Sequence, residues 1–150
     1  MKNGESELTA YCGLYCGDCI RYRCRAADLS ESLLDEIEKN HWLQYTAVKK
    51  SDVEAFDQFE ALPKLLKALA ELKCNTPCRA GGDGCGQPCA ISACVKGKDL
   101  DGCWQCPDFE TCDKLEFLVP LHGDSVRNNL RAIQQHGLEN WAQHRDKCYP

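Results

Sequence analysis

The sequence predicts a small, mainly α-helical domain that includes an irregular cysteine-rich region. Leucines recur at three- and four-residue spacing between residues 28 and 73, which is the pattern of helices with one apolar face. The stretch 74–112 instead carries eight cysteines among glycines and prolines, without an apolar period long enough to fold by burial alone. Because thiolates close in sequence are ready metal ligands, we expect a metal-stabilised domain with metal-binding knuckles.

Length favours one domain over residues 1–150, with division into a helical part and a knuckle part as the alternative for a metal-rich chain. The hydrophobic share of 43% includes 13 cysteines, so the conventional apolar core is thin and needs support from metals or disulfides. We divide the domain into a cysteine knuckle at 11–24, a helical part at 28–73, a second knuckle at 74–112 and a C-terminal helix at 124–145.

The use of cysteine favours metal over disulfides. The number of cysteines is odd, and the first ten residues hold no apolar stretch that could act as a signal peptide. No run approaches the roughly 18 apolar residues of a membrane span. We therefore expect a cytoplasmic protein with no membrane association, whose thiols stay reduced. Disulfides and buried free cysteines are the alternatives.

The first knuckle holds four closely spaced cysteines. Cys12, Cys16 and Cys19 have Cys-x3-Cys-x2-Cys spacing, Cys24 follows, and a glycine comes directly after each of the first two. Four thiolates in so short a stretch could close a tetrahedral zinc site. The same spacing occurs in proteins that hold a [4Fe–4S] cluster, so an iron–sulfur cluster is the alternative cofactor.

The helical part reads as three helices. A capping box that begins at Asp28 opens the first, and a break follows near Asn40. Ser51 or Asp52 could cap the second, and Pro63 suits either the first turn of the third or a kink between the two. We expect the apolar stripes to pack as the small hydrophobic core, with a partner-binding groove as the alternative. The stripes comprise Leu29, Leu33, Leu34, Ile37, Trp42, Leu43, Tyr45, Val53, Phe56, Phe59, Leu62, Leu65, Leu66, Leu69 and Leu72.

The segment after the second knuckle predicts one further helix. Asp124 or Ser125 could cap it and Gly137 could close it, after which the apolar face continues to Trp141 in a short final turn.

Several of these motifs resemble those of a family of small cysteine-rich bacterial and archaeal proteins that carries a domain-of-unknown-function name. The resemblance implies zinc binding and a cytosolic location, and it implies no particular reaction. The matching motifs are Ala10-Tyr11-Cys12-Gly13-Leu14-Tyr15-Cys16-Gly17-Asp18-Cys19, Cys78-Arg79, Cys89-Ala90-Ile91-x2-Cys94, Cys103-x2-Cys106-Pro107-x-Phe109-x2-Cys112 with Lys114-Leu115, and Asn129-Leu130-x2-Ile133-x3-Gly137-Leu138-x2-Trp141.

Two departures from that family stand out. Its members often continue after the last tryptophan into a second cysteine, whereas this chain stops at Cys148-Tyr149-Pro150. Glu110-Thr111 stands where the family tends to have a proline. We therefore do not expect His144 and Cys148 to form a terminal metal site.

Twelve cysteines are candidate metal ligands, enough for three four-cysteine sites. Chain order groups them in fours, although two zinc sites with spare cysteines also fit, and Cys24 is the first that we would leave out. The three groups are Cys12, Cys16, Cys19 and Cys24; Cys74, Cys78, Cys85 and Cys89; and Cys94, Cys103, Cys106 and Cys112.

A closed four-cysteine zinc site has no open coordination position, which makes the metal structural. No metalloprotease, nucleophile-elbow, phosphate-loop or dinucleotide motif occurs, so the sequence does not favour an enzyme. The formal net charge of −5 disfavours nucleic acid as a partner. The sequence thus predicts a zinc-binding interaction or accessory module with a protein partner; an iron–sulfur redox protein and a nucleic-acid-binding knuckle protein are the alternatives.

Overall fold

The computed structural model of the chain describes residues 4, 6–23, 25–82 and 88–147. It is mainly α-helical, as the sequence predicts, and its described residues form no strand, only an isolated antiparallel bridge between Thr9 and Tyr15. The chain divides into two compact units. We call residues 1–23 with 74–150 the cysteine-rich unit, and residues 24–73 the helical hairpin. No helix among the described residues is long and apolar enough to cross a membrane.

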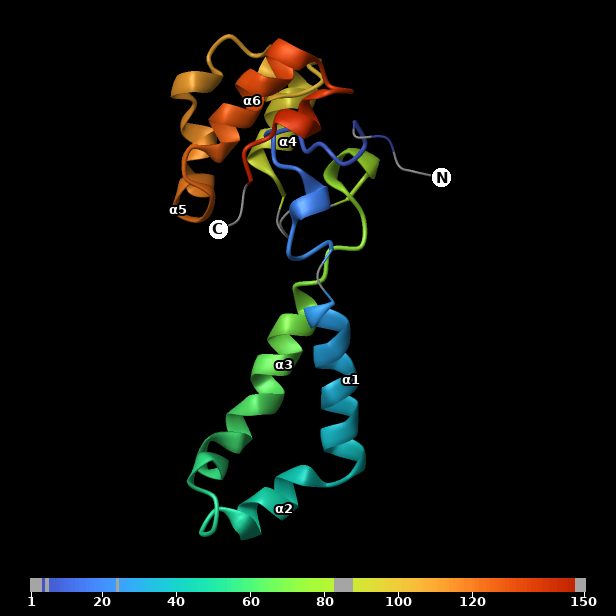
Figure 1. Cartoon of the computed structure of the whole chain (residues 1–150), viewed down its shortest axis with the longest axis vertical. Helices are drawn as coiled ribbons and strands as arrows, with labels where there is room; N and C mark the ends of the chain where they lie inside the picture. The colour runs from blue at the N-terminus through green and yellow to red at the C-terminus, as the bar shows by residue number, and fades with distance from the viewer. Residues whose placement is uncertain (1–3, 5, 24, 83–87, 148–150) are drawn as a thin grey trace. The chain divides into compact units, whose positions relative to one another are not determined.

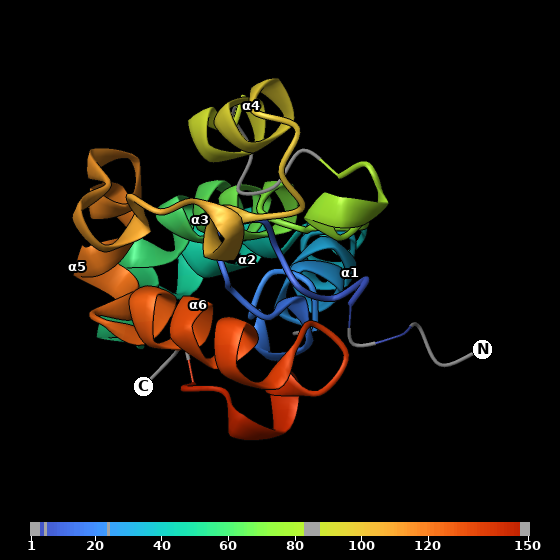
Figure 2. The ribbon, with the colours of Figure 1, turned by 90° about the horizontal axis from the view of Figure 1, so that it is seen from above.

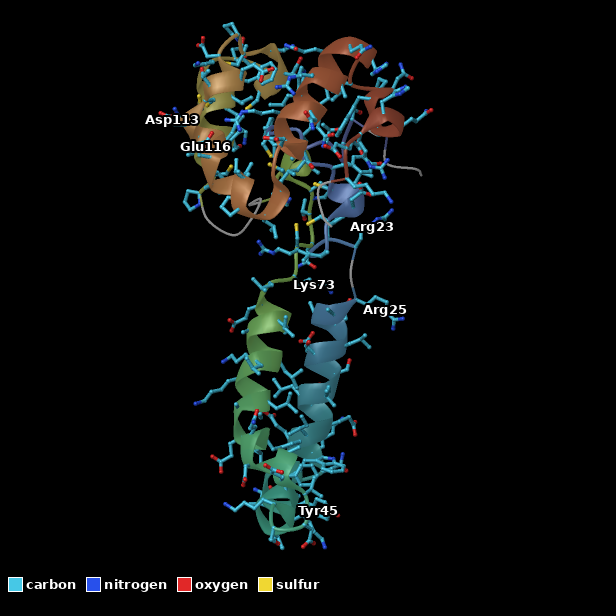
Figure 3. All side chains as sticks on the ribbon, turned by 60° about the vertical axis from the view of Figure 1, so that its left-hand side comes forward. Arg23, Arg25, Tyr45, Lys73, Asp113 and Glu116 are labelled. Carbon is cyan, nitrogen blue, oxygen red and sulfur yellow. The ribbon has the colours of Figure 1, made fainter. Side chains whose placement is uncertain are left out.

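The helical hairpin is built on two long helices that run side by side (Figure 1). Its elements in chain order are α1 (Ala26–Lys39), α2 (Trp42–Lys49), the 3-10 helix η2 (Glu54–Ala61) and α3 (Leu62–Glu71). Figure 3 shows Arg25 and Lys73 at the end where the hairpin opens and Tyr45 at its far end. Some side chains of α1 and α3 point into the space between the two helices, while others point outward.

Two predicted boundaries of the hairpin are confirmed. His41, with a φ of 54°, separates α1 from α2 directly after the break expected at Asn40. Pro63 lies in the first turn of α3, where its missing N–H removes no helical hydrogen bond.

The predicted caps of the hairpin are wrong. Arg25 is the N-cap of α1, and Asp28 lies inside the first turn, where its carboxylate pairs with the ammonium of Lys73. The second segment is a 3-10 helix whose N-cap is Val53, while Asp52 accepts a hydrogen bond from Lys49 at 3.0 Å. In both places the aspartate carboxylate pairs with a lysine side chain and does not cap a helix N-terminus.

The hydrophobic core lies in the cysteine-rich unit, so the expectation that the helical stripes form it is wrong. Two helices can cover only one side of each other, and most stripe residues of the hairpin therefore stay exposed. The buried cluster instead consists of Ile91, Val95, Cys103, Trp104, Phe109, Leu115, Leu118, Val126, Leu130, Ile133, Trp141 and Ala142.

The cysteine-rich unit consists of short turns around three helices. Seen from above, α4 and α6 are separated, with short turns between them (Figure 2). The described elements are η1 (Cys16–Asp18), η3 (Cys78–Ala80), α4 (Ala90–Gly97), η4 (Cys103–Gln105), η5 (Phe109–Thr111), η6 (Asp113–Leu118), α5 (Val119–His122), α6 (Ser125–His136) and η7 (Trp141–His144).

Helix α4 corrects the prediction that 74–112 is irregular throughout. It is eight residues long and has one buried apolar pair at four-residue spacing, Ile91 and Val95, each 2% exposed. A single pair is too short a period to be read in sequence, but it suffices when the rest of the core covers it.

The predicted start of the last helix and its end at Gly137 are confirmed. The predicted extent of 124–145 is too long, because Trp141–His144 forms the separate turn η7, and the predicted cap makes no capping hydrogen bond. Helix α6 begins at Ser125 and ends before Gly137, whose φ of 75° suits glycine. Asp124 is the N-cap residue but makes no capping hydrogen bond, and the Ser125 hydroxyl donates to the carbonyl of Lys147 at 3.1 Å.

Candidate metal centre

The first cysteines lie on a tight loop that packs on α6. The Cys16 amide donates to the carbonyl of Leu8 at 2.7 Å, and the Ala10 amide donates to that of Leu14 at 2.8 Å. The buried Asn129 side chain donates to the carbonyl of Gly13 at 3.1 Å, which attaches the loop to the helix. These bonds fix the backbone that carries Cys12 and Cys16.

The glycines after these cysteines are required by close packing. Gly13 has a φ of 85°, and a Cβ there would lie 3.0 Å from Cδ2 of Leu130. A Cβ on Gly17 would lie 2.2 Å from the ring of Tyr15. The Cys-Gly repeats therefore let the loop lie close against its neighbours.

A backbone hydrogen bond brings the second knuckle to the first. The Cys74 amide donates to the carbonyl of Arg21 at 3.0 Å, two residues after Cys19. Cys78 follows at the start of η3, whose turn is closed by Gly81 in the left-handed region with a φ of 94°. Two sulfurs from each knuckle thus share one neighbourhood.

The pKa of Cys16 shows which sulfurs lie near it. The pKa of the Cys16 thiol is raised to about 11, mainly by burial and also by the nearby Cys19, Cys78 and Cys74 sulfurs, while a backbone hydrogen bond at Cys78 acts in the opposite direction. We call Cys16, Cys19, Cys74 and Cys78 the first thiol cluster. Its members come from segments more than fifty residues apart in the chain.

A second thiol cluster surrounds the buried Cys103, which is 8% exposed. The pKa of Cys103 is raised to about 12, mainly by burial and also by the nearby sulfurs of Cys112, Cys106, Cys94 and Cys89. We call Cys94, Cys103, Cys106 and Cys112 the second thiol cluster. They line a cavity of about 280 Å³.

Lys98 is a functional candidate that the sequence analysis missed. Its Nζ lies 3.8 Å from the Sγ of Cys106, and the charges of Cys106 and Cys94 raise its pKa. A cation beside a group of thiolates offsets part of their negative charge. The available signal was its position four residues after Cys94, at the end of α4.

A larger apolar cavity of about 410 Å³ adjoins the first cluster. Six cysteines contribute to its wall, including Cys12 and Cys89, which belong to neither cluster as defined above. The six are Cys12, Cys16, Cys19, Cys74, Cys78 and Cys89.

Charged and aromatic side chains hold the cysteine-bearing turns together. The Arg145 guanidinium donates to both Asp18 carboxylate oxygens, at 2.6 and 2.8 Å, and this contact lowers the pKa of Asp18. Arg79, directly after Cys78, stacks over the rings of Tyr11 and Trp104, 5.4 and 5.5 Å from their centroids. Each contact ties the neighbour of a cysteine to a distant segment.

The structure redistributes the predicted groups of cysteines. Two members of the first predicted group lie with two of the second, whereas the third group stays together as the second thiol cluster. Cys24 and Cys85, both predicted ligands, lie outside the described residues, as does Cys148. The other half of that terminal pair, His144, stacks on His136 with ring centroids 3.8 Å apart.

In the described ranges, no three Cys, His, Asp or Glu side chains already stand in the geometry of a metal site. The ten cysteines there are thiols without disulfide bonds. The sulfurs of each cluster therefore lie near one another, but they do not surround a common point as metal ligands would.

Comparison with curated proteins and with solved structures found no match. A family model described as "Protein of unknown function (DUF3795)" matches residues 8–117. This match covers both thiol clusters and most of the chain. The cysteine-rich chain therefore belongs to the DUF3795 family of proteins of unknown function.

Proposed function

We propose that this chain binds zinc at two structural four-thiolate sites, formed by the first and the second thiol cluster. The observation that carries the proposal is the convergence of sulfurs from distant segments, Cys16 and Cys19 with Cys74 and Cys78, and Cys94 with Cys103, Cys106 and Cys112. Four cysteine thiolates in tetrahedral arrangement are the usual ligands of structural zinc.

The raised thiol pKa values support a dication at each cluster. Without a metal, burial and mutual repulsion keep Cys16 and Cys103 protonated at neutral pH. A bound dication would stabilise the thiolates, so binding would release protons and draw the sulfurs closer together. The free energy of binding would then add to the folding free energy of the cysteine-rich unit.

We propose a cytoplasmic accessory module that acts through contact with a protein partner. Four thiolates leave zinc no open position for a substrate or water, so the metal would hold the turns rather than react. The reduced thiols on which the sites depend suit the cytoplasm. The acidic net charge of −5 does not suit a nucleic-acid partner.

Metal analysis of anaerobically purified protein tests the sites. We expect about two zinc ions per chain, and about one after Cys19→Ser or Cys106→Ser, because each removes a ligand from a different cluster. The double variant should lose both ions. Cys148→Ser is the matched control and should keep both. Full zinc content in the Cys19 and Cys106 variants would refute the assignment.

An iron–sulfur cluster is the second candidate for the first thiol cluster. The cavity of about 410 Å³ favours it, because this space exceeds that of a single ion and six cysteines line it. The same anaerobic protein separates the two candidates. Stoichiometric iron with broad visible absorbance would support the cluster, whereas colourless protein with zinc alone would exclude it.

A further inference from the structure

The helical hairpin buries few apolar side chains of its own. Among its described residues, Ile37 on α1 and Leu66 on α3 are the buried apolar ones, 4% and 7% exposed. The other buried residues there are Ser30 and Thr46, whose hydroxyls donate to carbonyls of their own helices. A two-helix unit with so small an interior needs a further apolar surface to cover it.

Five exposed leucines occupy one face of the hairpin. The buried Ser30 and Ile37 mark the side of α1 that faces α3. At 100° per residue around the helix, Leu29 and Leu33 both lie to one side of this direction. Leu65, Leu69 and Leu72 lie to the corresponding side of Leu66 on the antiparallel α3. We call these five residues the leucine face; they are between 45% and 61% exposed.

The two helices beside this face carry opposite charge. Helix α1 has five carboxylates and one lysine, whereas α3 has two lysines and one carboxylate. The hairpin thus has an acidic and a basic side, joined along the leucine face. A surface with this pattern is complementary to a second copy of itself turned by half a rotation.

We propose that the leucine face is a dimer interface, on which the hairpins of two copies form an antiparallel four-helix bundle. A two-fold axis parallel to the helices places α1 of one copy on α3 of the other, so that every neighbouring pair is antiparallel. The alternative axis places α1 on α1 and brings the carboxylates of two acidic helices together. Charge selects the first arrangement.

The register of the hairpin predicts the contacts across this interface. The ion pair of Asp28 with Lys73 sets which residues of α1 and α3 lie at the same level. Counting from it, Leu29 lies level with the partner's Leu72, and Leu33 lies within one residue of the level of the partner's Leu69. At the edge of the bundle, Glu36 lies within one residue of the level of the partner's Lys64. Within its own helix, Glu36 contacts Lys39 at 3.9 Å and Asn40 at 2.9 Å, and both contacts are exposed to water.

Sedimentation equilibrium of the full metal-loaded chain tests the proposal. We expect a reversible dimer, and Leu33→Glu should raise the dimer dissociation constant about 100-fold because it buries two charges at the centre. Val48→Glu is the matched control, since Val48 is 77% exposed on α2 and lies outside the leucine face. It should leave the dissociation constant unchanged. Both variants should keep their zinc, because the metal sites lie on other residues.

A charge swap tests the arrangement of the helices without changing the apolar surface. Glu36→Lys should raise the dissociation constant about fivefold, and adding Lys64→Glu should restore it, because the pair is exposed and occurs twice. A chain that is monomeric at all concentrations would refute the dimer, as would equal effects of Leu33→Glu and Val48→Glu. Failure of the second substitution to restore affinity would refute the pairing of α1 with α3. Zinc content is measured separately, so neither result depends on the proposed metal sites.

Discussion

Single residues of the N-terminal loop decide how closely it approaches α6. Gly13 combines a left-handed φ with a site where a Cβ would meet the buried side chain of Leu130. Gly97, at the end of α4, has open space around its missing Cβ and no left-handed φ. The two glycines therefore form a matched pair for substitution.

Gly13→Ala should destabilise the protein by about 1–3 kcal/mol, because the side chain forces both backbone strain and a shift of Leu130. Gly97→Ala should be neutral or should stabilise by up to about 1 kcal/mol, since alanine favours a helix. Urea unfolding monitored by circular dichroism gives both values. An equal effect of the two substitutions would contradict the packing argument.

The Asp18 carboxylate is a second residue with a measurable effect. Arg145 lowers its folded-state pKa, so the contact stabilises the folded chain at pH values above the unfolded pKa of Asp18. That stability is lost as the pH falls through the folded pKa. The difference in unfolding free energy between the native chain and Asp18→Asn should therefore be largest near neutral pH and shrink in acid.

Glu110→Gln provides the control for this pH dependence. Glu110 also pairs with an arginine, Arg131, and its pKa is lowered, but both side chains are about half exposed to water. Solvent screening makes such a pair weak. A pH-dependent loss as large for Glu110→Gln as for Asp18→Asn would show that burial at Arg145 contributes nothing.

At the scale of elements, α6 is the main support of the cysteine-bearing loop. Leu130 is fully buried at 0% exposure, and Trp141 after the helix donates from its indole nitrogen to Thr9 at 2.9 Å. Leu121 on the neighbouring α5 is 59% exposed. One face of α6 therefore packs against the loop that carries Cys16 of the first thiol cluster.

Leu130→Ala should destabilise the protein by about 2–5 kcal/mol, since it leaves a cavity between α6 and the loop. Leu121→Ala should change the unfolding free energy by less than about 1 kcal/mol. Thermal unfolding of metal-loaded protein compares the two. A small effect of Leu130→Ala would mean that the loop holds its position without the helix.

The elements also show what sequence reasoning could and could not predict. The limits of α6 were readable because Gly137 and an unbroken apolar period mark them, and His41 confirms the break after Asn40. Helix α4 was not readable, because Ile91 and Val95 form only one pair. The proximity of Cys19 and Cys74 could not be predicted either. It depends on the backbone hydrogen bond between Cys74 and Arg21, which no sequence pattern encodes.

At the scale of the whole molecule, the described cysteines and the hydrophobic core belong to one unit. Trp104 and Trp141 are buried in the cysteine-rich unit, whereas Trp42 lies on α2 of the hairpin and is 42% exposed. The two units should therefore respond differently to loss of metal.

Chelation should remove the near-ultraviolet signal of Trp104 and Trp141 while much of the helical circular dichroism remains. The cysteine-rich unit depends on the proposed zinc, whereas α1, α2 and α3 hold no described cysteine. Adding zinc back under reducing conditions should restore the aromatic signal. Complete and simultaneous loss of helical and aromatic signals would show one cooperative unit instead.

The hydrogen bond between Cys74 and Arg21 has a consequence for which segments can be inserted into the cysteine-rich unit. The chain leaves the cysteine-rich unit after residue 23 and returns at residue 74 beside the point of departure. A host whose two junction ends meet can accept inserts of different length and kind, because closing the gap costs little chain entropy. We therefore expect that residues 24–73 can be replaced by a reporter or another binding module without loss of the fold of the cysteine-rich unit.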